Sequence, residues 1–170
     1  MKLFRKAKQL LAPASGTLVS LADLPDPAFA EGMLGEGIAI DPDDGNPDSP
    51  CRFCSPCKGE VAGITDTAHA YNILTDDGLE LLLHIGIDTV ELKGRGFFPK
   101  VKAGDRVDVG DLLVEVDLSV LREGGYSTLT PLIITNPDLL TSSEPASLTA
   151  SRRVECGKDA VLRYEIAKEK

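Results

Sequence analysis

The chain has 170 residues, of which 42% are hydrophobic and 26% are charged, and its formal net charge is −9. This length suits a single domain that buries its own core, and the acidic balance disfavours nucleic acid, whose phosphates attract clustered Lys and Arg. No stretch approaches the roughly 20 apolar residues of a membrane span. Residues 1–6 lack the continuous apolar region of a signal peptide, so we expect a cytoplasmic protein.

Residues 1–11 form a basic segment at the start of this acidic chain. Over residues 2–11 the apolar side chains fall on one side of a helix and most basic side chains fall on the other. Such a helix is typical of weak contact with a membrane surface or a membrane-bound partner, and a solvated, frayed terminus is an equally good interpretation. Pro13 ends the segment, and residues 12–170 are expected to form the domain.

Composition favours β-structure for that domain. The chain contains 16 Gly and 11 Pro. Few long stretches have helical periodicity, so many short strands joined by tight turns are expected. The sequence therefore predicts an all-β fold.

Two stretches, residues 13–23 and residues 56–66, resemble each other. A Pro, a Gly, two aliphatic residues and an Asp recur at a constant offset of 43 residues. In each copy a turn leads into a strand, and the Gly supplies the backbone freedom that the bend needs. The repetition predicts an internally duplicated β motif.

Three cysteines, Cys51, Cys54 and Cys57, follow a stretch rich in Pro and Asp over residues 41–50, and Cys156 stands far away in the sequence. The stretch has nothing to bury and is expected to be an exposed loop. A zinc site would need Cys156 and a histidine as further ligands, so we predict no metal. Reduced thiols are the main expectation, with oxidation of the cluster and metal binding as alternatives.

The chain has two histidines, His69 and His84, and both belong to a predicted hairpin. Residues 69–74 and 79–85 have strand patterns, and residues 75–78 between them form an Asp-Gly turn. Antiparallel pairing around this turn places the two histidines near each other on adjacent strands.

Alternation along the second strand predicts which way His84 points. From Leu79 to Ile87 the odd positions are apolar, whereas His84 shares the other face with Gly86 and Asp88. We expect Gly86 to leave open space beside the ring. A half-buried histidine of the sheet is the plain alternative interpretation.

Two imidazoles a few ångströms apart can act together on one phosphoryl group. One ring nitrogen attacks phosphorus, and the other ring donates a hydrogen bond to the phosphoryl oxygens as charge develops. Thr67, two residues before His69, is placed to hydrogen-bond that ring and fix its tautomer.

Short strands continue to the end of the chain. One strand between two turns is expected within residues 101–113, and another over residues 114–118 leads into a helical turn over residues 118–123. The last strands are expected over residues 132–135, 148–154 and 160–166.

The segment from Leu83 to Gly94, Leu-His-Ile-Gly-Ile-Asp-Thr-Val-Glu-Leu-Lys-Gly, closely resembles the active-site signature of the glucose-type enzyme IIA family of the bacterial sugar phosphotransferase system. Further similarity lies in Phe29-Ala30-Glu31, Gly35 to Ile40, Thr67 to Ala70 and Ser127 to Pro131, and the likeness spans residues 12–168. The family implies a single-domain antiparallel β-sandwich or barrel built from a duplicated β motif.

The resemblance also implies a phosphotransferase component that needs no cofactor. It places the phosphorylated histidine on His84, the supporting histidine on His69 and the nearby threonine on Thr67. A phosphohistidine carrier similar to HPr would donate to His84, and the group would pass to a cysteine of a IIB domain during sugar uptake.

Partner recognition is expected on the surface around His84. Leu82, Ile85 and Val90 are candidates for an apolar rim, and Glu36 and Asp88 are acids able to meet basic residues of both partners.

Two other classes of protein compete with this interpretation. Residues 104–115 resemble the turn-strand-turn of biotinyl and lipoyl carriers, but no Lys stands at the tip of a matching hairpin. A zinc-dependent peptidase on a similar β fold needs three protein ligands and a catalytic base, and two histidines without a His-x-His element fall short. The phosphocarrier is therefore favoured.

Overall fold

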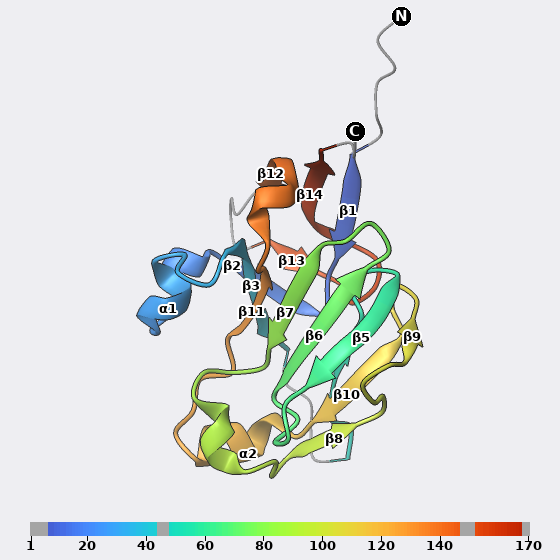
Figure 1. Cartoon of the computed structure of the whole chain (residues 1–170). Helices are drawn as coiled ribbons and strands as arrows, with labels where there is room; N and C mark the ends of the chain where they lie inside the picture. Colours follow the sequence, from blue (N-terminus) through green and yellow to red (C-terminus); the bar gives the residue numbers. More distant parts are fainter. Residues whose placement is uncertain (1–6, 44–47, 147–151, 168–170) are drawn as a thin grey trace, which may run out of the picture.

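An antiparallel sheet of eight strands is the largest element of the fold (Figure 1). The structure is a computed structural model that describes residues 7–43, 48–146 and 152–167. In spatial order the strands of the large sheet are β13 (Arg153–Val154), β2 (Gly16–Val19), β3 (Glu36–Pro42), β11 (Thr130–Ile134), β7 (Glu80–His84), β6 (Ala70–Thr75), β5 (Gly59–Ile64) and β9 (Arg106–Val107).

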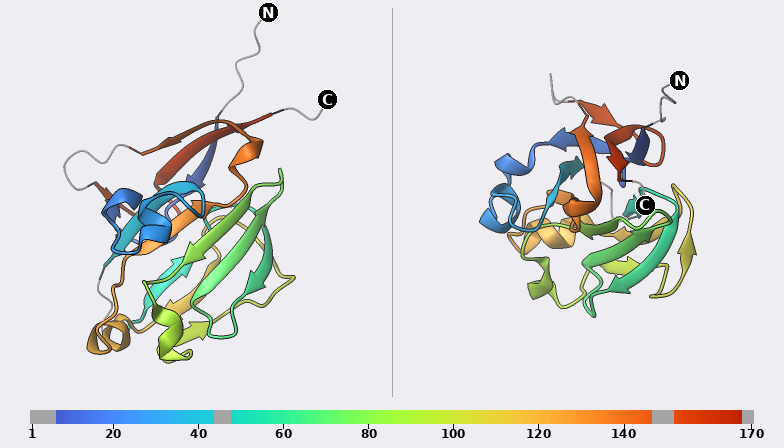
Figure 2. Two further views of the ribbon diagram at one scale, coloured as in Figure 1. Left: turned by 60° about the vertical axis from the view of Figure 1, so that its left-hand side comes forward. Right: turned by 45° about the horizontal axis from the view of Figure 1, so that its top comes forward.

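Two sheets of three strands complete the β-sandwich. The first has the order β1 (Lys8–Leu11), β14 (Ala160–Ile166) and β12 (Leu140–Pro145), and the second has the order β4 (Cys51–Cys54), β10 (Leu112–Val116) and β8 (Phe97–Pro99). The first small sheet forms a layer at the top of the left view of Figure 2. All pairings between these strands are antiparallel. The prediction of an all-β antiparallel sandwich is confirmed.

The main hydrophobic core draws on all three sheets. Leu10 of β1, Phe53 of β4 and Tyr71 of β6 belong to it, and each is 0% exposed. Side chains that alternate along a strand point to opposite faces, so the other face of the large sheet needs its own cover. A smaller apolar cluster around Phe29 and Ile133 covers it.

The sandwich repeats one pattern twice, as the offset of 43 residues predicts. Leu11 N donates to the carbonyl of Pro56 at 2.9 Å, and Cys54 N, 43 residues later, donates to the carbonyl of Pro13 at 2.7 Å. Each copy therefore holds the other through equivalent bonds. The spatial order of the large sheet is also symmetric, because β2 lies between β13 and β3 just as β5 lies between β9 and β6. The duplicated β motif is confirmed.

Short helices join the strands in the described residues. They are η1 (Leu21–Asp23), α1 (Pro27–Ala30), η2 (Thr89–Leu92), α2 (Leu118–Glu123) and η3 (Pro137–Leu139). The helical turn expected over residues 118–123 is thus confirmed as α2, whose first turn is capped by the carboxylate of Asp117. None of the helices in the described residues is long and apolar enough to cross a membrane.

The amphipathic helix expected over residues 2–11 is wrong where the structure describes it. Lys8–Leu11 form strand β1, which pairs with β14. Leu10 is 0% exposed in the core, and Lys8 forms an ion pair of 2.6 Å with Asp77. Tertiary pairing therefore overrides the local pattern, and these residues do not form a membrane-binding helical face. Residues 2–6 lie outside the described part.

The remaining strand predictions differ from the structure at their edges. Of the strand expected over residues 148–154, the structure shows β13 at Arg153–Val154, and residues 148–151 lie outside the described part. The stretch predicted as a loop over residues 41–50 begins inside β3, which ends at Pro42. The other predicted strands correspond to β9, β10, β11 and β14 with shifts of a few residues.

Candidate functional site

The hairpin of β6 and β7 brings the two histidines together. Ala70 pairs with His84 in the strand register, and Ile85 N donates to the carbonyl of His69 at 2.8 Å. His69 and His84 therefore end adjacent strands at the same edge of the sheet. Their ring centroids are 5.0 Å apart and the ring planes meet at 78°. The placement predicted from the Asp-Gly turn is confirmed.

The backbone around Gly86 fixes the orientation of His84. The Nδ1 atom of His84 lies 2.7 Å from the carbonyl oxygen of Gly86, which can only accept a hydrogen bond. The ring proton is therefore on Nδ1, and Nε2 keeps its lone pair.

Gly86 serves this orientation through its backbone rather than by leaving room for the ring. Its φ is +72°, and a Cβ at this position would lie 2.5 Å from Cγ2 of Thr89 and 2.8 Å from the carbonyl oxygen of Ser127. The expectation that Gly86 opens space beside His84 is therefore wrong, because neighbouring atoms fill that space. Glycine allows the left-handed turn that points the carbonyl at His84.

Several hydrogen bonds hold the loop after β7 in place. Thr89 Oγ1 donates to the carbonyl of Ile85 at 2.6 Å, and Ile87 N donates to the carbonyl of Ser127 at 3.1 Å. The backbone of Asp88 has a φ of 59°, a conformation that residues other than Gly rarely adopt. The loop is thus fixed on both sides of Gly86, which keeps its carbonyl on the imidazole.

Two threonines contact the ring of His69. Thr67 Oγ1 lies 2.6 Å from Nδ1 of His69, and Thr65 Oγ1 lies 3.2 Å from the same nitrogen. Ala68, between Thr67 and His69, has a φ of 58°, so the chain turns sharply enough to aim both hydroxyls at one atom. The hydrogen bond predicted for Thr67 is confirmed, and Thr65 is a contact that the sequence analysis missed.

Both imidazoles are neutral at pH 7. Burial and, to a smaller extent, the nearby His84 together lower the pKa of His69 from 6.5 to about 4. Burial also lowers the pKa of His84, although the hydrogen bond to Gly86 and the charges of Asp26 and Asp88 partly oppose the shift. A neutral ring retains the lone pair that a nucleophile needs.

The structure adds two residues to this site that the sequence analysis did not single out. The ring of Phe29 lies 5.3 Å from that of His84 at an angle of 58°. Asp26 caps α1 by accepting a hydrogen bond from Ala28 N at 2.9 Å, which fixes its carboxylate near His84. The signal available in the sequence was a helix cap, Asp26, three residues before Phe29.

The five residues expected at the rim separate into two groups. Ile85 is 0% exposed and belongs to the main core, so its assignment to a contact surface is wrong. It continues the buried odd-numbered face of β7, as the alternation itself required. Val90 is 47% exposed, Asp88 is exposed and Leu82 is half-buried. Glu36 is also exposed, but it shares the face of β3 that holds the core residue Ile38 and accepts a hydrogen bond from Ser143, so its assignment to the surface around His84 is wrong.

An acidic cavity of about 480 Å³ lies against the loop that follows His84. Its lining includes Asp26, Asp88, Tyr126 and Ser127. Asp26 and Asp88 both act electrostatically on His84. Two carboxylates around a concave surface favour a basic side chain as its occupant.

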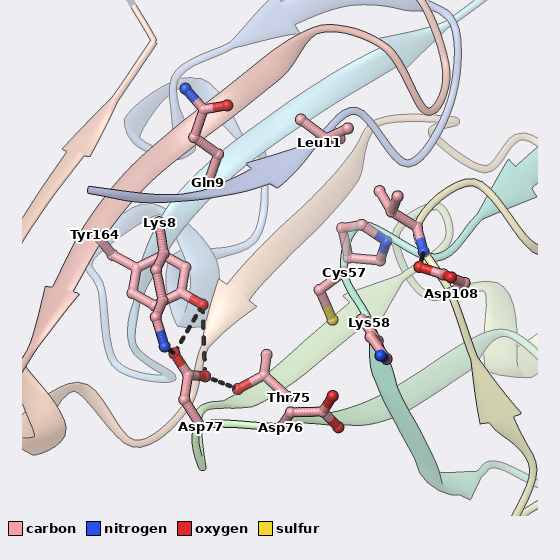
Figure 3. Close-up of a pocket in the computed structure, with 12 residues that line it drawn as sticks. Lys8, Gln9, Leu11, Cys57, Lys58, Thr75, Asp76, Asp77, Asp108 and Tyr164 are labelled. Atoms are coloured by element: carbon pink, nitrogen blue, oxygen red, sulfur yellow. Dashed lines mark hydrogen bonds and ion pairs between the residues drawn. The ribbon is translucent and has the colours of Figure 1, made fainter. Parts of the chain in front are cut away.

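A second cavity, of about 550 Å³, lies at the opposite end of the same hairpin (Figure 3). Asp77 accepts hydrogen bonds there from Lys8 at 2.6 Å and from Tyr164 at 3.2 Å, and also from Thr75. These partners hold the pKa of Asp77 below its usual value, although burial acts in the opposite direction. The bonds tie β1 and β14 to the hairpin turn, so this cavity contains a structural network.

The described residues contain no cluster of potential metal ligands. No group of three or more His, Cys, Asp or Glu side chains is arranged there to hold a metal ion. A zinc peptidase requires three such ligands.

The fold and the site together define the class of protein. An antiparallel sandwich presents two neutral imidazoles side by side, with Nε2 of His84 available and acids around it. This arrangement is suited to a protein that carries a phosphoryl group between partners.

The comparisons with known proteins agree with that class. Residues 8–140 match the family described as phosphoenolpyruvate-dependent sugar phosphotransferase system, EIIA 1. The chain is 45% identical over 146 residues to the PTS system glucose-specific EIIA component of Halalkalibacterium halodurans, a match that covers 86% of this chain and 81% of the relative. It is 43% identical over 147 residues to the protein of that name from Staphylococcus aureus, covering 83% of this chain and 85% of the relative.

A solved structure extends the likeness to three dimensions. The glucose permease IIA from Mycoplasma capricolum superposes with a TM-score of 0.83 at 36% identity and covers 96% of this chain and 99% of its own. The chain belongs to the EIIA family of the phosphoenolpyruvate-dependent sugar phosphotransferase system. It is a phosphocarrier in sugar uptake and a component of a phosphotransferase, and not a zinc peptidase or a biotinyl or lipoyl carrier.

Proposed function

We propose that Nε2 of His84 is the atom that accepts the phosphoryl group. The single observation that carries this proposal is the 2.7 Å hydrogen bond that occupies Nδ1 with the Gly86 carbonyl. The remaining nitrogen has a lone pair and lies on the half-buried face of β7, beside His69. The incoming group is transferred from the phosphohistidine of a carrier protein similar to HPr, so one phosphorus–nitrogen bond breaks as another forms.

His69 stabilises the group during transfer. When the Thr67 hydroxyl donates to Nδ1 of His69, the ring proton is on Nε2 of that ring. The Nε2–H group then donates to a phosphoryl oxygen on His84, across rings whose centroids are 5.0 Å apart. His69 assists without becoming phosphorylated, because its Nδ1 accepts the hydrogen bond of Thr67 and its Nε2 carries the ring proton, so neither nitrogen has a free lone pair.

The outgoing step delivers the group to a IIB domain. A cysteine thiolate of that domain attacks phosphorus, the bond to Nε2 of His84 breaks, and the neutral imidazole returns. Because the curated relatives are named glucose-specific, we infer a IIB domain of a glucose-type permease as the recipient. No cofactor takes part in these steps.

Both partners use the surface around His84. Val90, at 47% exposure, and the half-buried Leu82 supply apolar contacts. Asp88 and Asp26 supply negative charge, which steers basic residues of each partner toward the histidine. A shared surface explains how one histidine serves two proteins in turn.

The test uses the purified chain with phosphoenolpyruvate, enzyme I and HPr, followed by mapping of acid-labile phosphate. His84→Ala is expected to take up none, and the native protein is expected to hold one phosphoryl group on Nε2 of His84. His69→Gln, which keeps a hydrogen-bond donor, is the matched variant: uptake is expected to continue while release to a IIB domain slows at least tenfold. Label on His69, or uptake by His84→Ala at the native rate, would refute the assignment.

A further inference from the structure

The four cysteines fall into two environments. Cys51 and Cys57 belong to the main hydrophobic core together with Phe53, whereas Cys54 is buried outside that cluster. Cys54 is instead joined by a side-chain hydrogen bond to the thiol of Cys156. Two side chains that are 102 positions apart in the sequence thus interact with each other.

The same carbonyl group anchors both of these cysteines. Cys54 N donates to the carbonyl of Pro13 at 2.7 Å, and Sγ of Cys156 lies 3.6 Å from the same oxygen. Cys156 N donates to Ser15 Oγ at 3.0 Å, and Gly157 N donates to the carbonyl of Ala12 at 2.9 Å. The turn that carries Cys156 is therefore fixed against the same stretch of chain that fixes Cys54.

The internal duplication shows what this pair replaces. Cys54 corresponds to Leu11 at the offset of 43 residues, and Cys156 corresponds to Val109, since Gly157 and Gly110 bond the equivalent carbonyls of Ala12 and Ser55. Leu11 and Val109 both line the cavity of Figure 3. Where one half of the molecule has an apolar pair, the other half has two thiols.

Strand geometry excludes the pairing that the sequence spacing suggests first. Cys51 and Cys54 are three residues apart in β4. Such residues are separated by about 10 Å and point to opposite faces. A disulfide needs Cα atoms within about 7 Å. Cys51 and Cys54 therefore cannot form a disulfide with each other.

We propose that Cys54 and Cys156 are a modification site at which a low-molecular-weight disulfide forms a reversible intramolecular disulfide. Cys156, the half-exposed member, attacks one sulfur of the small disulfide, and the other half leaves as a thiol with one proton. The Cys54 sulfur then attacks the sulfur of Cys156, and the second half leaves as a thiol with the other proton. Two protein thiols are oxidised by two electrons, and one small disulfide is reduced to two thiols.

The local electrostatics support the second step. In the reduced pair the hydrogen bond from the Cys156 thiol lowers the pKa of Cys54 and raises that of Cys156. Once Cys156 is part of the mixed disulfide this bond is lost, and the charge of Arg52 still favours the Cys54 thiolate. Burial, by contrast, raises the pKa of Cys57 to about 12. Thiolates are the attacking species in disulfide exchange, so Cys57 is the unreactive reference within the same chain.

The experiment incubates the full reduced chain at pH 8 with graded ratios of oxidised to reduced glutathione, then blocks the remaining thiols and maps the peptides without reduction. We expect a linked peptide of Cys54 and Cys156 while Cys51 and Cys57 are alkylated. The link is expected to raise the melting temperature by roughly 5–10 °C, because it closes a long loop of the unfolded chain. Cys57→Ala, which places no hydroxyl in the core, is the matched control and should form the same link as the native protein.

Cys156→Ser decides the result, because this half-exposed position accepts serine more readily than the buried Cys54. It is expected to form no internal link and to show the same melting temperature in oxidised and reduced buffer. A link that contains Cys51, adducts of glutathione without an internal link, or four alkylated cysteines at every ratio would each overturn the proposal. Phosphoryl uptake by His84 is a separate readout, so failure of one proposal does not affect the other.

Discussion

The carbonyl of Gly86 holds the ring proton of His84 on Nδ1, and Nε2 keeps a lone pair only while the ring is neutral. Burial places both histidine pKa values below their usual range, so the site works with imidazole rather than imidazolium. The same burial has a consequence for stability, because the unfolded chain binds protons at these positions more tightly than the folded chain.

The first prediction concerns stability against pH. The pKa of His69 is about 4 in the folded protein and 6.5 in the unfolded chain. The contribution of His69 to the free energy of unfolding is therefore fully present above pH 6.5 and is lost as the pH falls from 6.5 toward 4. The loss reaches about 2 kcal/mol at pH 5 and about 3 kcal/mol below pH 4. Guanidinium unfolding at pH 7 and pH 5 should show a larger decrease for the native protein than for His69→Gln, and equal decreases would contradict the prediction.

The second prediction concerns Thr67, whose hydroxyl lies 2.6 Å from Nδ1 of His69. Thr67→Val removes this bond, so the ring of His69 loses its fixed tautomer and release of the phosphoryl group should slow about tenfold. Thr67→Ser keeps the hydroxyl and should retain the native rate. Nitrogen NMR of His69 reports the tautomer directly; a native spectrum in Thr67→Val would show that Thr65 alone sets it.

At the scale of elements, the connection after η2 offers a test of backbone strain. Lys93 caps the end of η2 with a φ of 52°, and its side chain is exposed. Lys93→Gly should therefore stabilise the fold by about 0.5–1 kcal/mol, whereas Lys93→Val should destabilise it by more than about 1 kcal/mol. Glu91→Gly, inside the same short helix, is the control and should destabilise the protein; urea unfolding measures all three.

The elements also show where the sequence was sufficient. The hairpin of β6 and β7 was predictable because its Asp-Gly turn and its alternation specify one register. Lys8–Leu11 were not, since four residues fit a helix and a strand equally well and only pairing with β14 decides between them. Asp26 and Phe29 were missed for a related reason, because their approach to His84 depends on how α1 packs on the sheet.

Over the whole molecule, the repeated offset of 43 residues predicted the architecture better than any single strand did. It identified equivalent turns before Gly16 and Gly59, and the structure places both glycines at the start of equivalent strands. The interaction of Cys54 with Cys156 was not predictable from the spacing of the cysteines, because the two residues are 102 positions apart and only the folded sandwich brings them together. Both features follow from the way the two copies hold each other through Pro13 and Pro56.

The last prediction tests that equivalence. A Cβ at Gly16 would lie 2.1 Å from the carbonyl oxygen of Asp41, and a Cβ at Gly59 would lie 2.1 Å from the carbonyl oxygen of Leu74. Each oxygen belongs to the neighbouring strand and cannot move without breaking the ladder. Gly16→Ala and Gly59→Ala should therefore each destabilise the fold by at least about 3 kcal/mol.

The matched control is Gly63→Ala in the same strand as Gly59. The nearest atom to a Cβ there is Nδ2 of Asn72 at 3.7 Å, an ordinary contact. Alanine at this position should change the free energy of unfolding by less than about 1 kcal/mol, since it adds no clash and reduces the freedom of the unfolded chain. If Gly16→Ala is tolerated while Gly59→Ala is not, the two copies do not constrain the backbone equally, and the symmetry of the sandwich does not extend to its energetics.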